Sequence, residues 1–178
     1  MASLTNQSMF EALFDRRLKP TGAFAEELKA AGYDASRAQG KYPTETWTRC
    51  LGLARKHVWP QLSEAEAFRH IGREFTEGFL ETITGRLVGA ALPFMTPASF
   101  LKRLASYFRM GREDSGLSFD LVELGTSSAR VVVHNPAAVP GTFVAGMIDL
   151  MFVRVKRQGT VEVLQKTPAD YELLVRWQ

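Results

Sequence analysis

The fold class follows from one stretch in which apolar and polar residues alternate: LSFDLVEL at 117–124, then GTSS at 125–128 and ARVVVH at 129–134. Alternation with a period of two is typical of a half-buried β-strand, and a short Gly- and Ser-containing segment between two such runs is typical of a turn. The stretch therefore predicts an antiparallel hairpin.

A second hairpin is predicted after one helix. Pro140-Gly141 precedes apolar residues at helical spacing over 143–151, and residues 160–165 and 171–177 alternate on either side of a turn. The order from residue 117 is strand, strand, helix, strand, strand. A small antiparallel sheet packed against helices is the economical fold for this order.

Residues 1–111 show helical spacing instead, so the chain is predicted to be one α+β domain over 1–178, mainly helical in 1–111, with two hairpins around one helix in 117–178. The clearest helix start is Ser63, which with Glu66 forms a capping box. Apolar spacing continues from there to Ile83, which predicts one long helix. Further helices are predicted near the N-terminus, after Pro43-Thr44 and from Thr96-Pro97 to Gly111.

Composition narrows the function classes. Hydrophobic residues make up 46% and charged residues 23%, as in ordinary globular proteins, and the basic residues behind the net charge of +3 are scattered. Scattered charge is weak evidence for nucleic-acid binding. The chain starts without a signal-peptide pattern, and its most apolar stretch, 79–95, carries charges and is too short to span a bilayer. We expect a cytoplasmic protein with neither a nucleic-acid nor a membrane partner.

Cys50 and His57 are the most chemically suggestive pair, since a spacing of seven places them two turns apart on one helical face. Such a pair could bind a metal or make an activated thiolate. Two ligands are too few for a structural zinc site, however, so no metal site is predicted. The single cysteine excludes an internal disulfide and suits a reducing compartment. Cys50 is expected to be a small buried hydrophobe, with a thiol-dependent enzyme as the open alternative.

The sequence contains no nucleophile elbow and no phosphate-binding glycine loop, so no catalytic residue and no cofactor is predicted. Its twelve Phe residues could fill a core or line an apolar cavity. The candidate residues for a ligand pocket are Trp47, Cys50, His57, Phe75, Phe79 and Phe108.

Glycines in the predicted long helix suggest close packing. Gly78, Gly85 and Gly89 would share a face within about 60° on a continuous helix. Such a face lets another helix approach closely, either within the chain or from a second copy. These three glycines are the candidate interface of a homodimer.

Several runs resemble one family. Gly40-Lys41-Tyr42-Pro43, then Trp47 and Cys50, then the stretch 66–79 (EAFRHIGREFTEGF) and Thr82-x-x-Gly85-Arg86 resemble the paralogous domain of unknown function expanded in myxobacteria. The opening residues 10–18 and 28–34 resemble it as well. The resemblance spans nearly the whole chain and implies no particular activity.

The order of elements is also similar to that of the haem-NO-binding, vinyl-reductase-type and TRAPP-subunit domains. That resemblance implies a small or lipidic ligand or a dimeric scaffold, and the TRAPP branch, which can acylate a buried cysteine, makes Cys50 a candidate by analogy. The haem branch carries a Tyr-x-Ser-x-Arg motif. The nearest string here, Tyr33-Asp34-Ala35-Ser36-Arg37, has a different spacing and lies in a predicted loop, so no haem is expected.

These observations together predict a non-enzymatic sensory or adaptor module. It would bind a small apolar ligand or a protein partner, as a homodimer. A purely structural dimerisation scaffold and a thiol-dependent enzyme using Cys50 and His57 are the alternatives.

Overall fold

The C-terminal part contains the predicted sheet. The computed structural model describes residues 3–37, 39–113, 118–134, 139–167 and 169–178. Four antiparallel strands pair in the order β4-β5-β7-β6, and their bounds are β4 Ser118–Gly125, β5 Ser128–His134, β6 Gly159–Gln165 and β7 Asp170–Trp177. The predicted hairpins and the α+β fold class are confirmed, although Leu117 lies outside the described residues.

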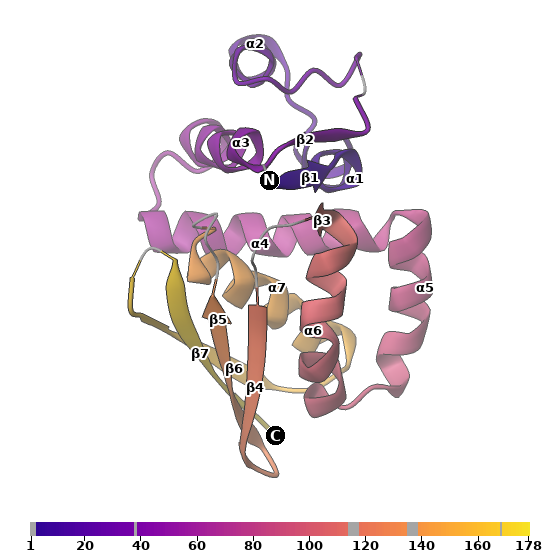
Figure 1. Cartoon of the computed structure of the whole chain (residues 1–178), viewed down its shortest axis with the longest axis vertical. Coiled ribbons are helices and arrows are strands. Elements are labelled where there is room, and N and C mark those ends of the chain that lie inside the picture. The colour runs from indigo at the N-terminus through magenta and orange to yellow at the C-terminus, as the bar shows by residue number, and fades with distance from the viewer. Residues whose placement is uncertain (1–2, 38, 114–117, 135–138, 168) are drawn as a thin grey trace.

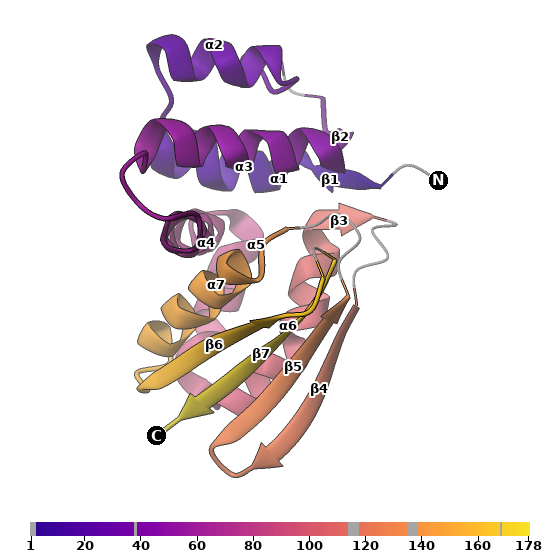
Figure 2. The ribbon, with the colours of Figure 1, turned by 90° about the vertical axis from the view of Figure 1, so that its left-hand side faces the viewer.

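Helix α7 (Gly141–Arg154) connects the two hairpins and covers one face of the sheet (Figure 2). It packs against α4 (Glu64–Leu80), which begins at the predicted capping box of Ser63 and Glu66. Glycines allow the two helices to touch: a methyl group at Gly72 would lie 2.0 Å from the carbonyl oxygen of Phe143. Helix α4 thus runs between the sheet layer and the N-terminal helices (Figure 1).

The prediction of one long helix from Ser63 through Gly89 is wrong. The structure ends α4 at Leu80 and starts a new helix, α5 (Ile83–Ala91), in a different direction (Figure 1). The Thr82 hydroxyl makes the break: it donates to the carbonyl of Phe79 (2.7 Å) and accepts from the amide of Gly85 (3.0 Å), which caps the new helix. The 3₁₀ turn η2 (Leu92–Phe94) and α6 (Pro97–Gly111) follow.

The N-terminal part forms a separate layer above α4 (Figures 1 and 2). It contains a small sheet in the order β2-β1-β3, which the sequence did not predict. Its elements are β1 Leu4–Asn6, α1 Gln7–Phe10, η1 Glu11–Leu18, α2 Gly22–Ala30, β2 Lys41–Pro43 and α3 Thr44–Val58, and β3 is Arg112–Glu113. Helices are present near the N-terminus, as predicted, but η1 is a π-helix.

Aromatic rings hold this layer onto α4 and α7. Trp47 of α3 is fully buried, with its ring centroid 5.1 Å from that of Phe10, 5.7 Å from that of Phe75 and 6.4 Å from that of Phe143. Edge-on ring contacts at such distances are favourable. The four rings belong to four different helices, so they fix the distance between the layers.

Candidate functional site

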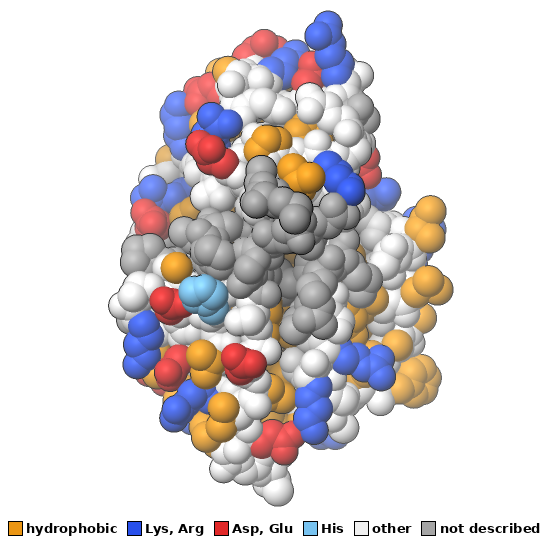
Figure 3. Space-filling view, viewed as in Figure 1, with side chains coloured by type: hydrophobic (Ala, Val, Ile, Leu, Met, Phe, Trp, Pro, Cys, Tyr) orange, Lys and Arg blue, Asp and Glu red, His pale blue; other side chains and the backbone are white. Residues whose placement is uncertain are grey.

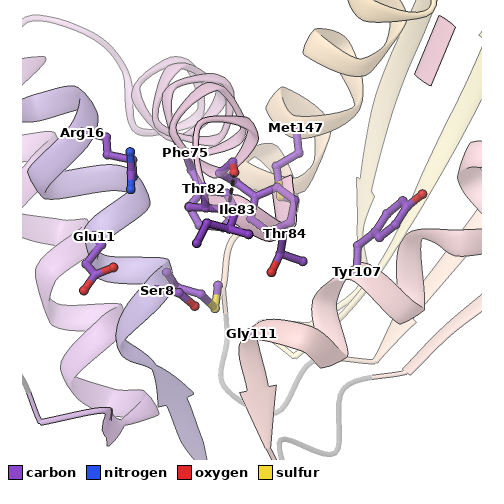
Figure 4. Close-up of a pocket in the computed structure, with 12 residues that line it drawn as sticks. Ser8, Glu11, Arg16, Phe75, Thr82, Ile83, Thr84, Tyr107, Gly111 and Met147 are labelled. Carbon is purple, nitrogen blue, oxygen red and sulfur yellow. Dashed lines mark hydrogen bonds between the residues drawn. The ribbon is translucent and has the colours of Figure 1, made fainter. Parts of the chain in front are cut away.

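A pocket of about 290 Å³ lies where the N-terminal helices meet α4, α5, α6 and α7 (Figure 4). Its wall is mainly apolar, with polar groups from η1 and from the start of α5. The volume is at the low end of the range for small-molecule sites. The lining residues are Ser8, Met9, Glu11, Arg16, Phe75, Phe79, Thr82, Ile83, Thr84, Tyr107, Gly111 and Met147.

The π-helix η1 provides the charged side of the pocket. In a π-helix residues five apart are hydrogen-bond partners, so Glu11 and Arg16 lie on the same side of η1, and both line the pocket (Figure 4). The neighbouring Arg17 is tied to α4: its Nε lies 2.8 Å from Oε2 of Glu74. π-Helical segments are rare and occur frequently at functional sites. The position of η1 in the wall therefore supports a functional role for the pocket.

Helix α6 closes the opposite side. Gly111 is in tight contact with Met9, since a methyl group at Gly111 would lie 2.4 Å from Met9 Sδ. One turn earlier, the Tyr107 hydroxyl points to the sulfur of Met95 at 3.9 Å, and its ring is stacked with Phe100 at 6.0 Å between centroids. The part of this wall formed by Tyr107 and Gly111 is therefore packed against its neighbours.

The predicted pocket residues divide into three groups. Phe75 and Phe79 line the pocket, whereas Trp47, Cys50 and His57 are not part of the lining. The side chain of Phe108 lies outside the described residues. The pocket residues that the sequence predicted correctly, Phe75 and Phe79, thus both lie on α4.

Cys50 and His57 are not brought together at an open site. Cys50 is fully buried, and burial raises the pKa of its thiol to about 12. His57 faces α2 instead: its ring is stacked on Phe24 at 4.9 Å, and its Nε2 lies 3.2 Å from Oε1 of Glu27, an ion-pair distance without hydrogen-bond geometry. The thiolate that nucleophilic chemistry needs is therefore disfavoured.

The three glycines do not form one face, because Gly78 belongs to α4 while Gly85 and Gly89 belong to α5. Gly78 packs against η1, where a methyl group would lie 1.8 Å from the carbonyl oxygen of Ala12. A methyl group at Gly85 would lie 1.7 Å from the carbonyl oxygen of Phe79. The prediction that Gly78, Gly85 and Gly89 share one helical face is therefore wrong. Gly78 and Gly85 pack against other parts of the same chain.

The other histidines lie away from the pocket. His70 is stacked with Trp59 at 6.1 Å between ring centroids, and His134 pairs with Asp170 at the end of β5. Among the described residues, no three His, Cys, Asp or Glu side chains are arranged to hold a metal ion. The described part also contains no helix long and apolar enough to cross a membrane.

Sequence reasoning missed most of the pocket wall, including Met9, Arg16, Tyr107 and Met147. Met9 and Met147 are apolar residues at helical spacing, but such spacing cannot tell a filled core from a hollow one. Thr82, followed three residues later by Gly85, was the available signal, because Thr is a favoured N-cap and a cap there would have ended α4 beside the pocket.

Residues 3–178 match the family model described as "Protein of unknown function (DUF2378)". The chain belongs to this family. The resemblance found in the sequence is thereby confirmed over nearly its whole length. No characterised protein matches the chain in sequence.

The fold is similar to that of solved H-NOX domains. The Fe(II) unliganded H-NOX protein from K. algicida aligns with a TM-score of 0.68 at 12% identity, covering 98% of this chain and 96% of that one. An oxygen-binding H-NOX domain related to soluble guanylate cyclases gives 0.67 at 14%, covering 97% and 92%. A mutant H-NOX from T. Tengcongensis gives 0.68 at 14%, covering 97% and 94%. At these identities the likeness establishes the fold alone.

The pocket residues do not fit a haem. Protein-bound haem iron takes an axial His, Cys, Met or Tyr. No His or Cys is among the described lining residues, the hydroxyl of Tyr107 is directed at Met95, Met9 is packed on Gly111, and Met147 is a buried core residue of α7. The chain thus has the fold of the H-NOX domains without an evident iron ligand in this pocket.

Proposed function

We propose that the protein is a sensory or adaptor domain that binds a small apolar ligand in the pocket between η1 and α6. The observation that carries the proposal is the pocket itself, whose wall is formed by Met9, Phe75, Phe79 and Met147 with one charged end. Apolar cavities with a few placed polar groups are the usual form of small-molecule sites.

The position of the pocket suggests how a ligand would signal. Its wall takes residues from the N-terminal layer and from α6 and α7, which support the sheet. A ligand that binds one relative position of these layers better than another would shift the balance between them. The likeness in fold to H-NOX domains supports this assignment only as an analogy.

The two alternatives differ in what they require. A thiol enzyme needs an ionised, accessible Cys50, and the burial of this residue and the raised pKa of its thiol weigh against that reading. A dimerisation scaffold needs no ligand, so binding in the pocket separates it from our proposal. Homodimer formation remains a prediction.

A dye titration tests the proposal. The naphthalene dye ANS, which fluoresces in apolar surroundings, should bind the native protein saturably. Thr84 is exposed at the pocket wall, so Thr84→Trp should fill space there with little effect on folding and weaken dye binding by roughly tenfold. Gln61→Trp, in the exposed loop before α4, is the matched control. Equal dye binding by the wild type and both variants would exclude this pocket as the site.

A further inference from the structure

Helix α5 and the turn η2 present large apolar side chains to solvent. Ile83, Leu87 and Phe94 are 85%, 74% and 90% exposed. Figure 3 shows hydrophobic side chains along the right-hand edge of the molecule, over α5, which Figure 1 places at the periphery. Ile83 and Leu87 are four residues apart and so lie on one side of α5, and a cluster of exposed large apolar side chains can mark an interaction site. We call these three residues the apolar row.

The charged residues within the segment that carries the apolar row are all basic, although the exposed Glu81, which pairs with Arg17, lies directly before it. Residues 82–112 include five Lys or Arg and no Asp or Glu. Arg86 of α5 and Lys102 and Arg103 of α6 are exposed, and Figure 3 shows Lys and Arg side chains beside the apolar row. Lys102 also reaches Glu123 of β4 at 2.7 Å. The surface formed by the apolar row and these basic residues is therefore complementary to a partner that has both an apolar interior and negative charge.

A second copy of the chain fits this surface poorly. A two-fold interface brings the same patch of both copies together. Arg86 and the basic residues of α6 would then lie close to the same positive charges of the second copy and repel them. A bilayer with anionic lipids meets both requirements, because it accepts apolar side chains between the headgroups and attracts Lys and Arg electrostatically.

We propose that α5 and η2 dock the protein on an anionic phospholipid surface. Ile83, Leu87 and Phe94 would enter the boundary between headgroups and acyl chains, and Arg86 would contact lipid phosphates. This is docking on one leaflet and needs no spanning helix, but it departs from the expectation, drawn from the sequence, of no membrane partner. It does not depend on occupancy of the pocket, although Ile83 and Thr84 also line that pocket.

Sedimentation with vesicles tests the proposal on the full chain. The wild type should bind vesicles of phosphatidylcholine mixed with phosphatidylglycerol, bind those of phosphatidylcholine alone at least tenfold more weakly, and dissociate at high salt. A double change, Leu87→Ser with Phe94→Ser, should weaken binding at least tenfold. Arg86→Gln should reduce it several-fold. Leu124→Ser, at a residue of β4 that is 47% exposed, should bind as the wild type does.

The affected residues are exposed, so circular dichroism should report the same helix content in all variants. A wild type that stays in solution with both vesicle types would overturn the proposal, as would undiminished binding by the folded double variant. If sedimentation velocity instead shows a wild-type dimer that the double variant abolishes, with no vesicle binding, the apolar row contacts a second copy and the proposal fails.

Discussion

At the scale of single residues, Cys50 shows what the structure adds to a motif. Spacing placed it with His57 on one helical face, but the fold buries the thiol among apolar side chains and raises its pKa from 9.0 to about 12. Burial disfavours the charged form because the interior solvates a thiolate poorly. The burial that keeps the Cys50 thiol protonated, and so unreactive, also makes the free energy of unfolding depend on pH.

The pH dependence has a definite sign. Above about pH 9 the unfolded chain loses the Cys50 proton while the folded chain keeps it, so the unfolded state binds fewer protons. The free energy of unfolding should therefore fall as pH rises from about 9 towards 12, and Cys50→Ala should lack this component. Urea denaturation of both proteins between about pH 7 and about pH 10 measures the difference in slope. Parallel curves would mean that the thiol is not protected as the structure indicates.

At the scale of elements, the break between α4 and α5 is the main correction to the sequence analysis. Phe75, Phe79 and Ile83 keep helical spacing across it, so periodicity alone cannot reveal a change of direction. The break depends on Thr82 as a cap and on Gly85, which lies against the last turn of α4. It also places Thr82, Ile83 and Thr84 on the pocket wall.

A pair of glycine substitutions tests this account of the break. A methyl group at Gly85 would lie 1.7 Å from a backbone carbonyl, so Gly85→Ala should lower the free energy of unfolding by about 1–3 kcal/mol. At Gly89 the nearest atom is Leu80 Cδ2 at 3.5 Å, an ordinary contact. Gly89→Ala should therefore be neutral or raise stability by up to about 1 kcal/mol, because Ala favours a helix more than Gly does. Chemical denaturation that ranks the two variants in the opposite order would contradict the account.

Elements were predictable where local rules decide them. The alternation in 117–134 and the capping box at Ser63 are local, and both were predicted correctly. Strands β1 and β2 have three residues each, which is too short to show alternation. Because 34 residues separate them in the chain, their pairing could not be predicted from local sequence. The π-helix was missed because the spacing of its apolar residues Phe14 and Leu18 also suits an α-helix.

At the scale of the whole molecule, the pocket results from how the layers meet. Its residues come from α1, η1, α4, α5, α6 and α7, and no two consecutive elements would create it alone. Phe75 and Phe79 were predictable as apolar residues of α4, but the space beside them depends on the angle between helices. The family match and the H-NOX-like fold agree with this architecture without naming a ligand.

Native mass spectrometry of freshly purified protein tests the central claim, ligand binding in this pocket, most directly. The wild type should retain a small non-covalent molecule that is released on denaturation, and Thr84→Trp should carry much less of it. The same spectrum gives the number of chains per particle. Only the bare polypeptide mass in the wild type, or equal retention of the molecule by Thr84→Trp, would contradict the account.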